Sequence, residues 1–183
     1  MEYFDIVDEN GTPTGLTAER SKAHAEGLPH RTAHLWLVRR REGRVQVLLQ
    51  KRSSCKDSFP SCYDISSAGH IPAGEDYVPS ALRELREELG LTAEAHELIP
   101  CGHVVRSRDE VFHGRPFRDR EYSRVFLLVR GEDDEPYRLQ KEEVESVLWM
   151  DMDECIAGVT TGAFPHCMYT DELEMVRDTF LSL

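Results

Sequence analysis

Hydrophobic positions along the chain fall into short runs of two different periods, which predict strands interleaved with helices. Residues 34–40 and 45–52 are rich in apolar side chains at strand spacing, and Gly43 between them indicates a turn. Three further strands are expected within residues 98–106, 122–130 and 147–150. Runs of this kind are typical of a folded chain rather than a disordered one.

The N-terminal stretch predicts a hairpin followed by a short helix. Apolar residues flank Asn10-Gly11, a dipeptide that accepts the positive φ angles of a tight turn. A brief helix is expected next, with Thr17 placed to cap it and Gly27 to end it. This extension precedes the strand pair described above.

A longer helix is predicted over residues 79–89, where apolar residues recur at helical spacing. Pro79 suits its first turn, and Gly90 supplies a stop. Two more helices are expected near the C-terminus, one begun by a capping pattern at residues 151–154 and one from about residue 170.

Strands that precede, surround and follow a central helix predict an α+β or mixed α/β sandwich. The chain has 183 residues, enough to bury a core, and shows neither an internal repeat nor a linker. We therefore expect one domain over residues 1–183, with the hairpin and helix extension at 1–30 and the core at 31–183.

Charge and composition narrow the classes of function. The formal net charge of -12 argues against binding a nucleic-acid polymer, whose phosphates such a field would repel. The chain contains no apolar run of membrane-spanning length and opens without a signal peptide, so no membrane association is expected. Its five cysteines are odd in number and show no C-x-x-C pairing, which favours a reducing cytoplasm.

The predicted central helix carries three carboxylates on one face. Glu84, Glu87 and Glu88 stand at i, i+3 and i+4, so their like charges repel one another. One interpretation is a solvated acidic face softened by the Arg83 to Glu87 pair at i, i+4. The other is a site for a hard divalent cation, which takes several oxygen ligands and removes the repulsion.

The residues around this helix decide between the two interpretations. Within "AGHIPAGEDYVPSALRELREELGL", Gly69 is followed after five residues by Glu75 and after seven more by the run from Arg83 to Leu91. This spacing resembles a complete Nudix box, the signature of the Nudix hydrolases. The resemblance implies a fold in which a mixed β-sheet is sandwiched between helices. It also implies hydrolysis of a diphosphate linkage in a small molecule such as a nucleoside diphosphate joined to another group.

The resemblance further implies roles for individual residues. The three helix glutamates, Glu84, Glu87 and Glu88, match the metal ligands, and Gly69 matches a glycine whose carbonyl commonly joins them. Glu75 and Arg83 match a structural ion pair. The expected cofactor is Mg²⁺ or Mn²⁺, which neutralises diphosphate oxygens. The general base varies among Nudix enzymes, and Glu121 and Glu143 are candidates outside the box.

A second resemblance is to the type I isopentenyl-diphosphate isomerases, which share the Nudix fold. It rests on "HRTAHLWLV", "LLQKRSSCKDSFPSCYDISSAGH", "REYSRVFLLV" and "AFPHCM". It implies a second metal site matching His30, His70, Asp119 and Glu121, with His24 as a fifth ligand only if one residue is deleted. It also implies diphosphate contacts from two basic residues, Arg52 and Lys56.

Isomerisation is disfavoured because two of its catalytic groups are missing, although the partner glutamate is retained as Glu121. The catalytic cysteine of the isomerases falls at Ala68, which has no proton to give, and the carbocation-facing tryptophan is replaced in a segment that offers only Phe164. The isomerases retain only the box glutamate matching Glu88, whereas this chain keeps all three. The remaining alternative to a hydrolase is a Nudix module that senses a nucleotide without turnover.

The group attached to the diphosphate is expected to be selected outside the box. The aromatic residues Trp36, Phe59, Tyr63 and Trp149 either stack a base or pack in the core. Residues 106–121 mix arginines with acids, and either clasp a ligand or form a charged surface excursion, the interpretation we favour. A homodimer through the N-terminal hairpin is a further hypothesis.

Overall fold

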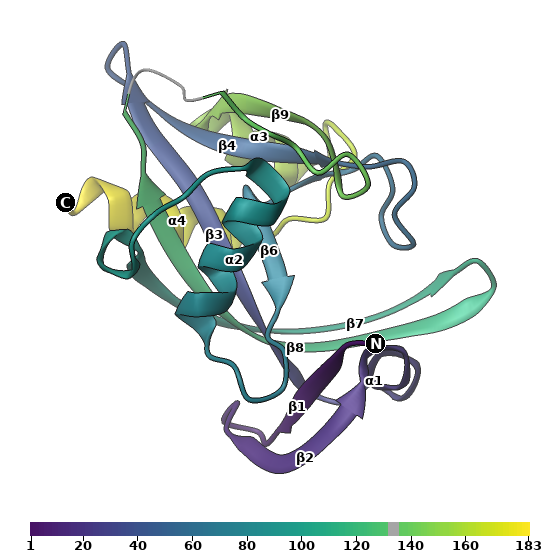
Figure 1. Cartoon of the computed structure of the whole chain (residues 1–183). Coiled ribbons are helices and arrows are strands. Elements are labelled where there is room, and N and C mark those ends of the chain that lie inside the picture. Colours follow the sequence, from purple (N-terminus) through teal and green to yellow (C-terminus); the bar gives the residue numbers. More distant parts are fainter. Residues whose placement is uncertain (132–135) are drawn as a thin grey trace.

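The computed structural model describes residues 1–131 and 136–183, and these form two β-sheets flanked by helices (Figure 1). The strands are β1 (Tyr3–Val7), β2 (Pro13–Glu19), β3 (His30–Arg41), β4 (Arg44–Arg52), β5 (Tyr63–Asp64), β6 (Ser67–His70), β7 (Ile99–Phe112), β8 (Arg115–Val129) and β9 (Val144–Asp151). The helices are α1 (Arg20–Glu26), α2 (Tyr77–Leu89), η1 (Ala95–Glu97), α3 (Met152–Thr161) and α4 (Thr170–Leu181).

The larger sheet is mixed and runs in the order β5-β4-β3-β8-β7, with β6 pairing with β3 and β9 with β4. β3 and β8 are parallel from His30 opposite Glu121 to Val38 opposite Val129, while β3 and β4 form an antiparallel pair. The strand pair predicted around Gly43 is confirmed.

The sheet separates two hydrophobic cores, because successive side chains of β3 point to opposite faces. Trp36 packs with Leu173 and Val176 of α4, whereas Leu35 packs with Leu85 of α2. Figure 1 shows α2 in front of the sheet and α3 and α4 behind it. The predicted sandwich is confirmed. Among the described residues, no helix has the length and apolar content that crossing a membrane requires.

The N-terminal hairpin forms a sheet of its own, as predicted, and β1 pairs antiparallel with β2. The predicted cap at Thr17 is wrong, because Thr17 pairs with Asp5 inside β2 and α1 begins only at Arg20. Gly27 does end this helix, with a left-handed φ of 71°.

Residues 106–121 are not the surface loop that the sequence favoured. They are the distal halves of β7 and β8, which continue as an antiparallel ladder to a turn at His113 and Gly114. Opposite charges across the ladder support the pairing, as in the 2.6 Å ion pair between Arg120 and Asp109. The sequence did not predict these strand halves, because neither of their faces is apolar and the usual alternation of apolar and polar residues is therefore missing.

Two predicted helix boundaries, the end of α2 and the start of α3, are confirmed. Gly90 ends the helix at φ 71°, and a Cβ there would lie 2.5 Å from the Cβ of Arg138, so only glycine fits. Asp151 caps α3 as predicted, because its carboxylate accepts hydrogen bonds from the backbone N–H groups of Asp153 and Glu154.

Candidate active site

A cleft of about 520 Å³ brings together many of the sequence-predicted residues. Its lining comes from α1, β3, β4, β5, β6, α2, β7, β8 and α4, and from the segments that follow β4 and precede β9 and α4. Acidic and basic side chains both line the cleft. Its predicted lining residues include Gly69, Glu84, Glu87, Glu88, His70, Asp119, Glu121, Arg52 and Lys56.

The three glutamates of α2 differ in their surroundings. Glu88 is buried, and its carboxylate accepts hydrogen bonds from Ser67 Oγ at 2.7 Å and from the backbone N–H of Ala68 at 3.3 Å. Glu84 is partly buried, and its Oε1 atom lies 2.8 Å from Nη1 of Arg83. The side chain of Glu87 is 51% exposed. Helical spacing therefore directs all three into one cleft, at graded depths.

Burial makes this acidic face costly without a cation. Burial raises the pKa of Glu88 to about 8, the Ser67 hydrogen bond opposes the rise, and the charge of Glu84 adds to it. The pKa of Glu84 is also raised by burial. A divalent cation would compensate these charges, because hard cations prefer several carboxylate oxygens. The donor set therefore fits Mg²⁺ or Mn²⁺.

Gly69 leaves space for one of these carboxylates. A Cβ built on Gly69 would lie 2.3 Å from the carboxyl carbon of Glu84, closer than packed atoms approach. Any larger residue at this position in β6 would push Glu84 out of its place in the cleft. The need for glycine here is steric, because its φ lies outside the left-handed region.

Glu75 and Arg83 do not form the predicted ion pair in the part of the chain that the structure describes. Arg83 is 2.8 Å from Glu84 and 3.2 Å from Glu87, so it braces the box glutamates. The carboxylate of Glu75 instead accepts a hydrogen bond from Ser80 Oγ at 3.2 Å.

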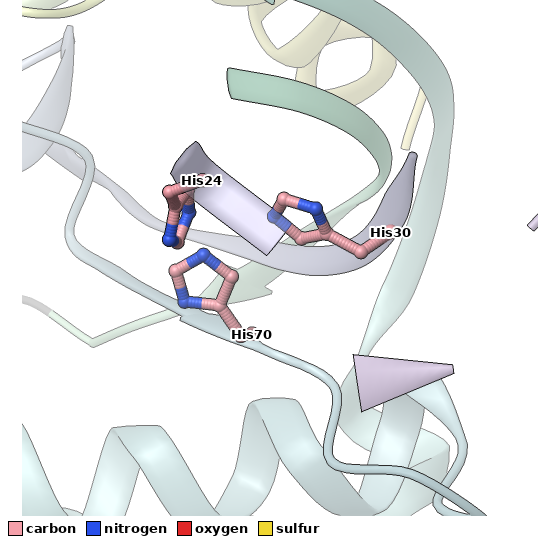
Figure 2. Close-up of side chains that lie close together, drawn as sticks. All are labelled: His24, His30 and His70. Carbon is pink, nitrogen blue, oxygen red and sulfur yellow. The ribbon is translucent and has the colours of Figure 1, made fainter. Parts of the chain in front are cut away.

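Three histidines converge beside the acidic face. His24 of α1, His30 of β3 and His70 of β6 lie with their rings turned toward one another (Figure 2). Their candidate ligand atoms lie within 4.8 Å of one another, and His30 forms a second such group with Asp119 and Glu121. Each Nε2 atom is buried without a hydrogen-bond partner among the described residues. Buried unpaired nitrogens beside carboxylates form a donor set that fits a metal ion.

Aromatic rings fix these imidazoles. Phe4, from the N-terminal hairpin, stacks on His30 at 4.9 Å and on His70 at 4.6 Å between ring centroids. Phe117 of β8 stacks on His24 at 4.6 Å. The hairpin and α1 therefore contribute to this cluster, and the structure places His24 beside His30 and His70.

The protonation states suit metal binding. Burial lowers the pKa of His24 to about 3, lowers that of His30, and lowers that of His70 well below its usual value. All three rings are therefore neutral at pH 7, the form that donates a lone pair to a metal. Burial raises the pKa of Asp119 to about 6 and that of Glu121 to about 8, and the charge of Asp119 adds to the rise at Glu121.

The two predicted basic residues of the cleft, Arg52 and Lys56, already have partners. Arg52 pairs with Asp64 at 2.9 Å and also donates to the carbonyl of Ser58, and Lys56 pairs with Glu143. Glu143, a candidate base, is therefore engaged by a lysine in this structure.

The candidate aromatic residues separate into core and cleft. Trp36 is fully buried, and Trp149 packs against the core on the α2 side, so neither offers a face to a ligand. Tyr63 and Phe164 pack together edge to face, with ring centroids 5.6 Å apart. Only Phe59 of these residues lines the cleft.

The sequence did not indicate a buried ion pair at the cleft wall. His34 Nδ1 lies 2.8 Å from Glu172 Oε1, and Trp36 Nε1 donates to the same oxygen at 2.8 Å. Burial lowers the pKa of His34, but Glu172 more than offsets this and raises it to about 9. The sequence signals that could have indicated this pair are the two residues themselves, which are polar and lie on otherwise apolar faces of β3 and α4.

Comparison with known proteins gives consistent matches. A family model described as the NUDIX domain matches residues 28–166. An uncharacterised Nudix hydrolase of Clostridium acetobutylicum is 37% identical over 153 residues, covering 84% of this chain and 71% of that protein. Nudix hydrolase 3 of Arabidopsis thaliana is 40% identical over 157 residues, covering 84% of this chain but 20% of the plant protein.

Among solved structures, the crystal structure of a Deinococcus radiodurans protein superposes with a TM-score of 0.65 at 20% identity. The alignment covers 97% of this chain and 98% of that one. At this identity the likeness concerns the fold, and it includes nearly the whole length of the chain.

Proposed function

The chain belongs to the Nudix hydrolase family, and from this premise we propose that it cleaves a diphosphate linkage in a small molecule by attack of water, with Mg²⁺ or Mn²⁺ as cofactor. The observation that carries the proposal is the convergence of all three box carboxylates and Gly69 in one cleft. A module that only binds its ligand has no need to keep Glu88 buried at an energetic cost.

The residues of the cleft have different roles in this proposal. Glu84, Glu87 and Glu88 would hold the cation, which when bound neutralises diphosphate oxygens and lowers the pKa of water. Ser67 orients Glu88, and Gly69 leaves space for Glu84. Glu87 is exposed and Glu121 has a raised pKa, so each is a candidate to accept the proton of the attacking water.

The proposal is tested by ³¹P NMR of the protein with Mg²⁺ and a substrate panel, run beside Glu87→Gln. The panel holds nucleoside di- and triphosphates, dinucleotides, sugar nucleotides and isopentenyl diphosphate. We expect cleavage products from the wild type and a loss of at least about tenfold in rate in the variant, because one cation ligand is removed.

The matched control is Glu174→Gln, an exposed glutamate on α4 that should leave the rate unchanged. Full turnover by Glu87→Gln would contradict the assignment. Conversion of isopentenyl diphosphate with its diphosphate intact would instead support the isomerase reading.

We further propose that His24, His30, His70, Asp119 and Glu121 hold a second divalent ion. Mixed nitrogen and oxygen donors favour Mn²⁺ or Zn²⁺ over Mg²⁺. Titrating metal-stripped protein with Mn²⁺ in a calorimeter is expected to show binding that His70→Ala loses, whereas His96→Ala, at an exposed histidine, retains it. An unchanged isotherm in His70→Ala would contradict the second site.

A further inference from the structure

Two arginines of β7 line the cleft beside the candidate metal ligands. Arg106 lies directly opposite Glu121 in the β7 and β8 ladder, and Arg108 lies directly opposite Asp119. Opposed residues of an antiparallel pair share one face of the sheet, with Cβ atoms about 4.5–5.5 Å apart. The two guanidinium groups are therefore neighbours of the carboxylates on the same wall.

Aromatic rings hold both guanidinium groups. The Cζ atom of Arg106 lies 4.2 Å from the ring centroid of Tyr169. Arg108 lies between two rings, with its Cζ atom 4.7 Å from the centroid of Phe59 and 5.1 Å from that of Tyr169. Contacts of this kind attract a cation and restrict its orientation while leaving its N–H groups available.

The two arginines differ in how their charge is balanced. Arg106 forms an ion pair of 2.7 Å with Asp171. Arg108 forms no ion pair with any residue that the structure describes. The other cations of the cleft, Arg20, Arg52 and Lys56, are each paired with a carboxylate. Arg108 is thus a preoriented cation with unused donors, inside a cleft that is otherwise rich in acids.

This arrangement favours an anion over a stacked base as the ligand. Phe59 and Tyr169 already contact guanidinium groups, so a nucleobase would have to displace a cation from a ring. A phosphate group needs no displacement, because a guanidinium donates two parallel N–H bonds to two of its oxygens.

We propose that Arg108, supported by Phe59, Tyr169 and Arg106, forms a subsite for a phosphoryl group that lies beyond the diphosphate undergoing cleavage. This inference rests on the proposed function and narrows its substrate class to diphosphates that carry an additional phosphate. Arg108 is then a specificity-determining residue: it contacts the substrate but takes no part in the cleavage.

The test compares inorganic tripolyphosphate with inorganic pyrophosphate as ligands in the presence of Ca²⁺, measured by calorimetry. Wild-type protein is expected to bind tripolyphosphate more tightly, and Arg108→Gln should reduce that preference about tenfold by removing a charge-assisted contact. Affinity for pyrophosphate should change less than about twofold. Tyr169→Leu, which removes one supporting ring, should reduce the preference to a smaller extent.

The matched control is Arg115→Gln, which changes the net charge equally at an exposed position near the hairpin turn. An equal preference in wild type and Arg108→Gln, or an equal loss in Arg115→Gln, would overturn the subsite. Failure of the proposed function would appear in a separate experiment, as absence of turnover with Mg²⁺. The preference for tripolyphosphate over pyrophosphate is a binding measurement and requires no cleavage.

Discussion

Replacing Glu88 by glutamine is expected to lower kcat/KM more than about a hundredfold while leaving the metal-free protein at least as stable as the wild type. The two effects have one cause. Glu88 is a buried carboxylate among other carboxylates, so its charge stabilises a bound cation and destabilises the fold without one.

The sign of the stability effect follows from the pKa. Burial raises the pKa of Glu88 to about 8 in the folded state, whereas an exposed glutamate titrates near 4.5. The unfolded chain therefore releases this proton first, and the wild type loses stability as pH rises from about 4.5 through 8. Glutamine has no proton to release and can still accept the hydrogen bond from Ser67, so the variant lacks this loss.

The measurement is urea unfolding of metal-stripped wild type and Glu88→Gln at pH 5 and pH 8.5, together with rates under saturating Mg²⁺. The stability difference should favour the variant more at the higher pH. Lower stability of the variant at both pH values would mean that Glu88 is needed for folding, and the loss of rate would then say nothing about the cation.

The acidic face of α2 was predictable because it is local. Spacings of three and four residues place side chains on one helical face whatever the rest of the chain does. Gly69 and Glu75 were found by their distance from that helix, and the Arg83 to Glu87 pair by its i, i+4 spacing. The contact of Arg83 with Glu84 in place of Glu75 was not predicted, because the loop that carries Glu75 takes its conformation only in the folded chain. The Thr17 cap failed for a similar reason, since pairing with Asp5 outweighed a weak capping preference.

The histidine cluster was predictable only through resemblance. His24 and His70 are far apart in sequence, and α1 and β6 bring them together only when the hairpin docks and Phe4 is buried between their elements. The Arg108 subsite was even harder to predict from the sequence, because the alternating charges of β7 and β8 resemble those of a solvated loop. The subsite depends on the cross-strand register and on two aromatic rings from distant segments, which come together only in the folded chain.

Glu172→Gln is expected to cost about 3–5 kcal/mol of unfolding free energy near pH 6, because it leaves the buried charge of His34 without its partner. These residues are 138 positions apart and join α4 to β3 at the cleft wall. Glutamine keeps the shape and can still accept the hydrogen bond from Trp36, so the change removes mainly the charge.

The pH dependence identifies the ion pair as the cause. Burial lowers the pKa of His34, but Glu172, with smaller contributions from Glu121 and Asp64, raises it to about 9. An unfolded histidine titrates near 6.5, so this stabilisation is fully present below about pH 6.5 and is lost as pH rises through about 9. Burial raises the pKa of Glu172, and the charge of His34 reverses this to a net lowering, so the glutamate contribution persists down to acidic pH.

Urea unfolding of wild type and Glu172→Gln at pH 6 and pH 9.5 checks this prediction, with the exposed Glu174→Gln on the same helix as the control. The difference between wild type and Glu172→Gln should be largest at pH 6 and should shrink toward about 1 kcal/mol at pH 9.5, the value of a neutral hydrogen bond. A difference that stays constant between the two pH values would show that Glu172 stabilises the cleft wall by packing rather than by its charge.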